Sequence, residues 1–368
     1  MTVASTVGVE SPTVLPDSTN VRRKLLGLQV LRFVAAFAVV LFHIGSGFQI
    51  EFGLKENIFG FGASGVDIFF VISGFIIAYT TDEAKGAWQF CRRRIVRIVP
   101  LYWTLTAGIV LIALMKPGLL NSTVVSGETI LKSLFFIPFE KVDGSIQPLL
   151  FLGWSLNYEM FFYAIYAACI ACGLRGPLSP SMFIVVLVAM GQFIQSENVA
   201  WRFYTNPLML EFVFGILLYL AYVHSAKLFV GRTWLMLAIF VATIAIRQMI
   251  PDLPWLLANG VPAVVLTAAA LSWSPPRTRA ITFLVLLGDA SYSLYLSHPY
   301  VIQLASKLLP HQSGLMAQGL AGIVACALSI AVSIVLYTMI ERPAQALFNG
   351  LAARRQASST LRKTENHI

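Results

Sequence analysis

The chain has 368 residues, of which 57% are hydrophobic and only 12% are charged, and its formal net charge is +9. The charged share is about half of that in soluble domains, so a lipid bilayer must act as part of the solvent. Four scattered cysteines exclude a disulfide framework. Basic cytoplasmic loops of a membrane protein explain the positive charge better than a nucleic-acid partner does.

Ten apolar runs follow a polar N-terminal segment, and each is predicted to be a helix. A helix needs about 20 apolar residues to cross the hydrocarbon core, and most runs reach or approach this length. The runs cover residues 26–48, 59–80, 95–115, 149–172, 181–195, 207–223, 233–250, 255–273, 281–304 and 317–340. The sequence therefore predicts an all-α fold, a polytopic transmembrane bundle of about ten helices.

Lysine and arginine are unevenly distributed between the two sets of loops. With a cytoplasmic N-terminus and ten helices, 18 of the 26 fall on the cytoplasmic side and 7 on the other. The positive-inside rule then predicts that both termini are cytoplasmic. We expect a disordered cytoplasmic tail over 1–22, a membrane domain over 23–344 and a basic cytoplasmic tail over 345–368. The external loop 116–148 is a candidate partial lid.

The first run, LRFVAAFAVVLFH, contains two ionisable side chains, which are costly in a membrane and mark functional sites. Arg32 and His43 are eleven residues apart, which returns to within about 20° of the same helix face with a rise of about 16 Å. The alternative is that Arg32 extends to the cytoplasmic surface while His43 lies at the external interface. The shared face favours one functional site.

Two carboxylates are candidates for orienting the His43 imidazole. Asp67 opens the second run in GVDIFFVISGF, at a depth similar to His43, although aspartate also favours a helix N-cap. Glu159 lies near the middle of the fourth run, in GWSLNYEMFFY, where so short a side chain reaches neither membrane surface. Trp154 and Ser155 are candidates to line the same cavity.

Four arginines, Arg92, Arg93, Arg94 and Arg97, lie in CRRRIVRIVP at the start of the third run. Positive-inside anchoring explains them, but guanidinium groups also bind phosphate with paired hydrogen bonds. Arg94 and Arg97 share one helical face. A phosphate clamp and a simple membrane anchor both remain open here.

The ninth run contains SYSLYLSHP, in which Ser291, Tyr295 and His298 are three or four residues apart and share one face. Aromatic residues at a membrane interface explain this pattern, and the wall of a substrate site explains it equally. Glu341, beside an arginine and a proline at the end of the tenth run, is interpreted as a charged cytoplasmic stop.

Five motifs in this order resemble the acyltransferase 3 family of integral membrane acyltransferases. They are Arg-x10-His, GVDIFFVISGF, Arg-x-x-Arg, W-x-L-x-x-E-x-x-F-Y and S-Y-x-x-Y-x-x-H-P, and the resemblance covers about residues 26–343. The compact form is similar to bacterial exopolysaccharide and O-antigen acetyltransferases. The resemblance implies a multi-pass protein of the cell (inner) membrane that moves an acyl group, usually acetyl, from cytoplasmic acyl-CoA to a glycan hydroxyl.

The resemblance, combined with the residues discussed above, assigns roles to twelve side chains. The expected partners are the lipid bilayer, acyl-CoA and a glycan or glycolipid acceptor, with no metal and no nucleic acid. A transporter or flippase for a glycan precursor is the alternative function, because buried ionisable residues also form transport relays. The candidate residues are His43, Arg32, Asp67 and Glu159 for catalysis, Arg92, Arg93, Arg94 and Arg97 for the acyl-CoA donor, and Trp154, Ser155, Tyr295 and His298 for the acceptor substrate.

Overall fold

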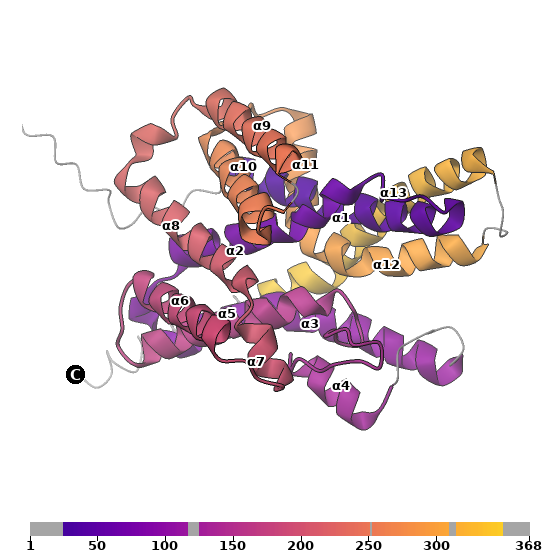
Figure 1. Ribbon diagram of the computed structural model, residues 1–368, viewed down its shortest axis with the longest axis horizontal. Helices are drawn as coiled ribbons and strands as arrows, with labels where there is room; N and C mark the ends of the chain where they lie inside the picture. Colours follow the sequence, from indigo (N-terminus) through magenta and orange to yellow (C-terminus); the bar gives the residue numbers. More distant parts are fainter. Residues whose placement is uncertain (1–24, 117–124, 251, 309–313, 349–368) are drawn as a thin grey trace, which may run out of the picture.

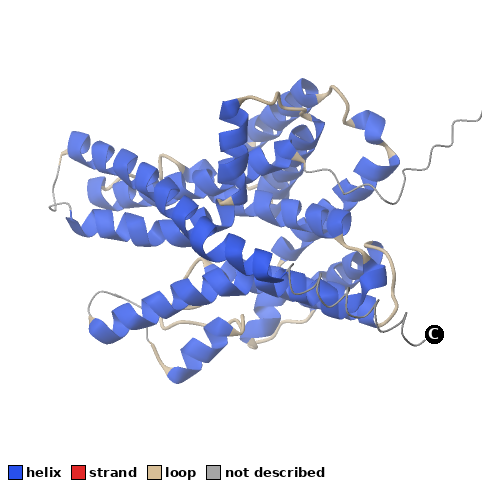
Figure 2. Ribbon diagram, turned by 180° about the vertical axis from the view of Figure 1, so that it is seen from behind, coloured by secondary structure: helices blue, strands red, loops and turns tan. Residues whose placement is uncertain are grey.

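The computed structural model describes residues 25–116, 125–250, 252–308 and 314–348, and within these ranges it contains helices and no β-strand (Figure 2). The predicted tail 1–22 lies outside the described residues, as do 117–124 of the predicted loop and 349–368 of the predicted C-terminal tail. The α-helices are α1 (Leu26–Phe52), α2 (Gly65–Thr80), α3 (Gly86–Met115), α4 (Gly127–Leu134), α5 (Gly153–Ala171), α6 (Leu178–Phe193), α7 (Val199–Tyr204), α8 (Leu210–His224), α9 (Thr233–Met249), α10 (Val261–Ser272), α11 (Arg279–Asp289), α12 (Ser291–Leu308) and α13 (Leu315–Leu336).

Each of the ten apolar runs contains a helical segment, so the prediction of a helical membrane bundle is confirmed. By length and composition, five helical stretches in the described part of the chain are able to cross a membrane, or six if α11 and α12 form one bent span. The helices α6 and α9 and the segment Leu256–Ser272 are apolar but shorter. The chain is a multi-pass membrane protein.

The ninth run is not the single straight helix that the sequence predicts. α11 and α12 meet at an angle of 71° around Ala290. Both halves pack along α1, and Gly288 lies so close to it that an added Cβ would stand 1.9 Å from the Gln29 carbonyl oxygen. Because of the bend, α11 and α12 both pack against α1. The SYSLYLSHP motif forms the first turns of α12.

The first residues of the predicted C-terminal tail are helical. Beyond α13, a π-helical turn over Tyr337–Glu341 leads into a last helical stretch that ends at Phe348. π-Helical turns are rare and often lie at functional sites. This turn carries Glu341, which is 2% exposed and therefore is not a solvated stop at the end of the helix.

Helices distant in sequence lie together around the centre of the molecule. α1 runs beside α12, which packs on α13, while α3 packs against α5 and α2 against α8 (Figure 1). Glycines allow α2 and α8 to cross closely: an added Cβ at Gly74 would stand 2.1 Å from the Phe212 carbonyl oxygen, and one at Gly215 equally close to that of Val71. Such small-residue contacts hold membrane helices together, and this one fixes Ser73 at the central cavity.

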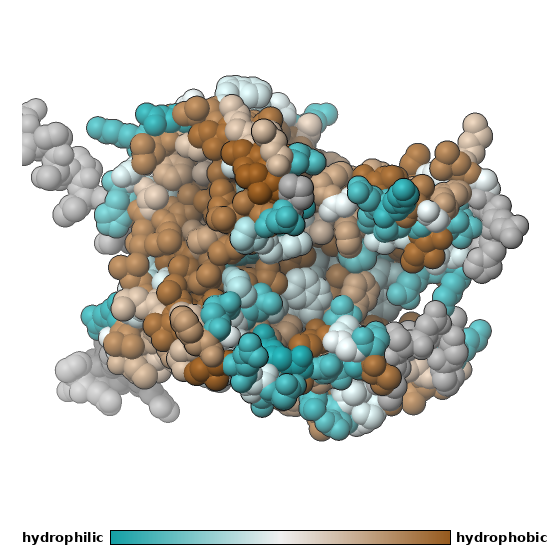
Figure 3. All heavy atoms as spheres, viewed as in Figure 1, coloured by the Kyte–Doolittle hydropathy of each residue, from teal (hydrophilic) through white to brown (hydrophobic). Residues whose placement is uncertain are grey.

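The outer surface is strongly apolar over the short helices and α13. No residue of α9 is buried, and α13 buries only Ala325, Ser329 and Ser333. Brown, hydrophobic side chains cover the broad surface over α8, α9 and α10, whereas hydrophilic residues gather near the lower centre (Figure 3). An apolar exterior of this kind faces lipid, so the buried polar residues at the centre need another explanation.

Candidate active site

A cavity of about 340 Å³ lies between α1, α2, α3, α5 and α12. Its apolar wall includes Phe69, Phe70 and Ile98, and its polar wall is unusually rich in charge for a membrane interior. Leu25 and Thr80 also line it. It therefore reaches the N-terminal end of α1 and the C-terminal end of α2.

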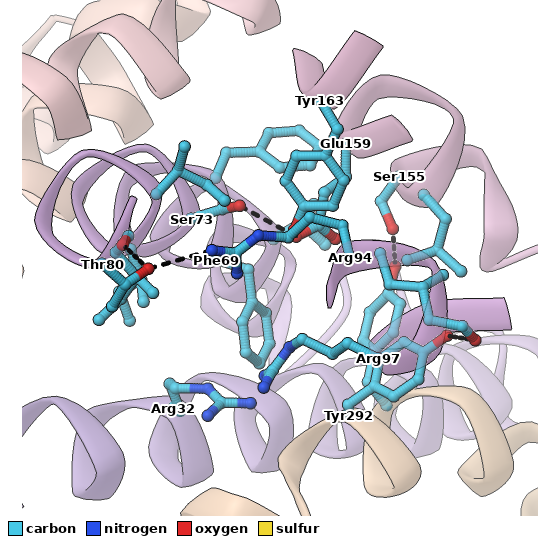
Figure 4. Close-up of a pocket in the computed structure, with 18 of the residues that line it drawn as sticks. Arg32, Phe69, Ser73, Thr80, Arg94, Arg97, Ser155, Glu159, Tyr163 and Tyr292 are labelled. Carbon is cyan, nitrogen blue, oxygen red and sulfur yellow. Dashed lines mark hydrogen bonds between the residues drawn. The ribbon is translucent and has the colours of Figure 1, made fainter. Parts of the chain in front are cut away.

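Three guanidinium groups converge on this cavity (Figure 4). Arg32 comes from α1, and Arg94 and Arg97 come from successive turns of α3. Arg32 donates a 3.0 Å hydrogen bond to Gln29, and Arg94 donates one of the same length to the Thr80 hydroxyl. The expected shared face of Arg94 and Arg97 is therefore present, and Arg32 joins it from another helix.

Two carboxylates accompany the arginines. Glu159 lines the cavity and accepts hydrogen bonds from Ser73, at 2.9 Å, and from the Tyr163 hydroxyl. Glu341 accepts a 3.0 Å hydrogen bond from Ser293 and lies near enough to Arg97 and Arg32 to interact electrostatically. The lining itself holds the three arginines and one carboxylate, Glu159, while Glu341 and Asp289 interact with Arg32 from outside it. The excess of positive charge in the lining attracts an anion in a low-dielectric cavity.

His43 lies outside the lining of this cavity and is paired with a second histidine. Its Nδ1 is 2.9 Å from the Val39 carbonyl oxygen and 3.2 Å from His298 Nε2. His298 Nδ1 is in turn 3.0 Å from the Leu294 carbonyl oxygen. The Phe151 ring, at a centroid distance of 5.5 Å, also packs against the His43 imidazole.

Tyr295 connects the cavity to the histidine pair. It lines the cavity, its hydroxyl is 2.8 Å from Ser155 Oγ, and it donates a 3.2 Å hydrogen bond to the Leu152 carbonyl. The centroid of its ring lies 6.3 Å from that of His298. The arginine cavity and His43 are thus separated by little more than one layer of side chains.

Neither of the two carboxylates that the sequence suggests as a partner of His43 lies beside its ring; His298 does. Asp67 accepts a 2.8 Å hydrogen bond from the Trp255 indole and lies beside Glu211, while Glu159 faces the arginine cavity. Neither prediction of a carboxylate on the imidazole therefore holds, because both side chains are engaged elsewhere and His298 occupies that position. Asp67 also makes no N-cap hydrogen bond, since it lies within the first turn of α2.

Four further predicted residues lie apart from the cavity. The Arg92 guanidinium stacks on the Phe348 ring at 4.2 Å, and Arg93 lines a small recess near the start of α3. Trp154 packs against Phe70 instead of lining the cavity. His298 is fully buried with both ring nitrogens engaged, so it offers no free nitrogen to an acceptor substrate.

Sequence reasoning also missed residues that belong to the site. Ser73 and Tyr163 lie inside recognised motifs, but their hydroxyl groups are compatible with any packed helix. Glu341 was misinterpreted because an arginine and a proline follow it at the end of an apolar run. The signal for its role was its position, because apolar residues lie within about one turn of Glu341 on both sides. A carboxylate in such a place is costly without a buried cationic partner.

Together, the helical bundle and its buried charges define a membrane-embedded protein with an arginine-lined cavity next to a pair of histidines. Residues 25–338 match the family model described as an acyltransferase domain, and the chain belongs to this family. It is therefore a membrane acyltransferase, and transport as the primary function is set aside.

Several curated proteins are similar to the chain over most of its length. The exopolysaccharide production protein ExoZ of Rhizobium meliloti is 35% identical over 80% of this chain and 95% of its own. The acyltransferase MdmB of Streptomyces mycarofaciens is 27% identical, over 88% of this chain and 92% of its own. The O-acetyltransferase OatA of Staphylococcus aureus is 24% identical over 76% of this chain but 51% of its own. No solved structure is significantly similar to the chain.

Proposed function

We propose that the enzyme transfers an acyl group, preferentially acetyl, from cytoplasmic acyl-CoA to a hydroxyl of a glycan such as an exopolysaccharide or its lipid-linked precursor. The observation that carries the proposal is the convergence of Arg32, Arg94 and Arg97 on one cavity that leads toward His43. The relatives named for exopolysaccharide production and O-acetyl transfer support the choice of acceptor and acyl group.

The cavity suits the anionic part of the donor. Arginine binds phosphate oxygens with planar, paired hydrogen bonds, and three of them supply the positive charge that a pyrophosphate needs. The cavity reaches Leu25 and Thr80, on the side of the basic segments that precede α1 and begin α3. The positive-inside rule places this side in the cytoplasm, where acyl-CoA is found.

The spacing along α1 suits the thioester end of the donor. Arg32 and His43 are separated by a helix rise of about 16 Å. The extended pantetheine arm of CoA spans a distance of this order. Phosphates at Arg32 and its two partners would then place the thioester at His43, so Arg32 belongs to donor binding and not to the bond-forming centre that we expected from the sequence.

Two routes of transfer are compatible with this arrangement. In the first, His43 removes the proton of the acceptor hydroxyl as its oxygen attacks the thioester carbonyl, and the C–S bond breaks as the proton passes to the departing CoA sulfur. In the second, a nitrogen of His43 attacks the carbonyl and releases CoA as its thiolate. The acceptor oxygen then displaces the imidazole from the acyl group, and the hydroxyl proton passes to the CoA thiolate. Both routes end in an ester and free CoA thiol.

The acceptor approaches from the end of α1 that carries His43. Phe151, at the end of the loop that precedes α5, packs on the His43 ring. The predicted lid, 116–148, ends three residues before Phe151, and we assign acceptor binding to this side. Ser155 and Tyr295 lie between the acceptor side and the donor cavity.

Mass spectrometry of the cell-surface glycan tests the proposal. Cells that make the protein should carry glycan with mass increments of acetyl groups, and cells without it should lack them. Complementation with the wild-type gene should restore the increments. An unchanged O-acetyl pattern in the deletion strain, for surface polysaccharide and its lipid-linked precursor alike, would contradict the proposed function.

A further inference from the structure

The contacts of the two histidines assign their protons. A carbonyl oxygen only accepts hydrogen bonds, so His298 Nδ1, at 3.0 Å from the Leu294 carbonyl, carries a proton. Pro299 also leaves the neighbouring carbonyl of Tyr295 without its helical N–H partner, which adds a second acceptor for this nitrogen. A neutral His298 then has a lone pair on Nε2.

The same reasoning fixes the tautomer of His43. Its Nδ1 faces two acceptors, the Val39 carbonyl oxygen at 2.9 Å and the lone pair of His298 Nε2 at 3.2 Å, so it carries a proton shared between them. The opposite assignment would turn the His43 lone pair toward a carbonyl oxygen. A cationic His298 would require the same repulsive contact and would bury a charge.

We infer that His298 is a positioning residue that holds the His43 ring with its proton on Nδ1 and its lone pair on Nε2, which makes Nε2 the nitrogen that reacts. Positive charge develops on the His43 ring in either transfer route, and the proton on Nδ1 then binds His298 Nε2 more strongly. A neutral imidazole thereby takes the place that a carboxylate holds in a catalytic triad. The catalytic consequence rests on the proposed function, but the tautomer does not.

The chain contains another histidine that serves as a control for the contact between Nδ1 and a carbonyl oxygen of the same helix. His224 lies exposed at the end of α8, and its Nδ1 makes the same type of contact, 2.9 Å from the Leu220 carbonyl oxygen. No second imidazole appears among its contacts in the described structure. Both rings contact a helix carbonyl but only His43 faces a second imidazole, so their comparison reports the effect of His298 together with that of burial.

Nitrogen NMR of the full-length protein, with ¹⁵N-labelled histidine, tests the tautomer. We expect His43 to show a protonated Nδ1 and an unprotonated Nε2, and His298→Leu to shift it toward the mixture shown by His224. Signals are assigned by comparison with His43→Ala and His224→Leu. A wild-type His43 with its proton on Nε2, or a tautomer unchanged in His298→Leu, would overturn the inference even if acyl transfer is confirmed.

Kinetics test the catalytic consequence separately. Loss of a hydrogen bond to a developing charge should lower kcat of His298→Leu by about 10- to 100-fold, with the KM for acyl-CoA changed by less than about threefold. His298→Gln, whose side-chain carbonyl can occupy the place of Nε2, should recover part of the loss, and His224→Leu should behave as wild type. Equal losses in the Leu and Gln variants, or a change confined to KM, would reject the positioning role.

If the proposed function fails, no variant will transfer acyl groups, yet the wild-type tautomer will still be observable. If only the inference fails, wild-type transfer will persist, while His43 carries its proton on Nε2 or keeps the same tautomer in His298→Leu. If His298→Leu does not fold, the wild-type spectrum and the Gln variant still decide the outcome.

Discussion

His43 Nδ1 and His298 Nε2 lie 3.2 Å apart, although 255 residues separate them in the sequence. α1 brings the first ring and α12 the second, and the bend between α11 and α12 allows this meeting. On the other side of Tyr295 lies the arginine cavity. The arginines that we propose to bind the donor and the nitrogen that we propose to react are therefore distinct groups, and substitutions should be able to separate them.

Arg97→Gln should weaken donor binding. Removing one guanidinium group from a phosphate contact costs about 1.5–3 kcal/mol, which corresponds to about a 10- to 100-fold weaker affinity for CoA. Calorimetric titration of the purified protein with CoA measures this change. Arg92→Gln is the matched control, because Arg92 stacks on Phe348 outside the cavity lining and should leave affinity within about threefold. Equal effects of both variants would remove the special role of the cavity.

Gly74→Ala should destabilise the bundle. The added methyl would meet the Phe212 carbonyl carbon and oxygen at 2.9 and 2.1 Å, so α2 and α8 would have to separate. Overpacking of this kind costs about 1–3 kcal/mol, which thermal unfolding in detergent should show as a lower midpoint. Gly108→Ala is the control, because its nearest neighbour, the Tyr300 hydroxyl, is 3.8 Å away. A midpoint unchanged by Gly74→Ala would contradict the close helix crossing.

Glu211→Gln should be tolerated. Glu211 is fully buried beside Asp67, within hydrogen-bonding reach of its carboxyl group. A hydrogen bond between two carboxyl groups requires a proton on one of them, and the amide of glutamine supplies a donor at the same place without a charge. We expect an unfolding midpoint equal to or above that of the wild type.

Asp67→Leu provides the contrasting change. It removes the acceptor of the Trp255 indole and leaves a buried donor unsatisfied, which costs about 1–3 kcal/mol. We expect a lower unfolding midpoint for this variant. A strong loss of stability in Glu211→Gln together with none in Asp67→Leu would reverse our interpretation of this carboxyl pair.

Much of the architecture could be predicted from the apolar runs, because in lipid every span must satisfy its own backbone and is therefore a helix. The bend at Ala290 was not predicted, because apolar residues resume on both sides of Gly288, Asp289 and Ser291 and resemble one continuous span. Gly288 approaches α1 closely at this point. The π-helical turn that buries Glu341 was hidden for a similar reason. Features set by contacts between helices leave little trace in a single run.

The site shows the same division. Arg32, His43, Arg94 and Arg97 were recognisable because charge in an apolar helix is costly. Their grouping could not be predicted. The helix face that Arg32 and His43 share suggested one common site, whereas Arg32 lines the cavity together with the arginines of α3. The expectation that a carboxylate supports His43 followed known triads and overlooked that a neutral imidazole also accepts a hydrogen bond.

Donor binding and bond formation occur at separate groups in the mechanism that we propose, and the variant His43→Ala should abolish only the second. Inverted membrane vesicles, which expose the cytoplasmic face, are supplied with radiolabelled acetyl-CoA, and label in the glycan of the same membranes is counted. General base catalysis contributes about 10²–10⁴-fold, so the variant should lose at least 100-fold in transfer while binding CoA as tightly as the wild type. Transfer within tenfold of the wild type by His43→Ala, at equal amounts of inserted protein, would contradict the account.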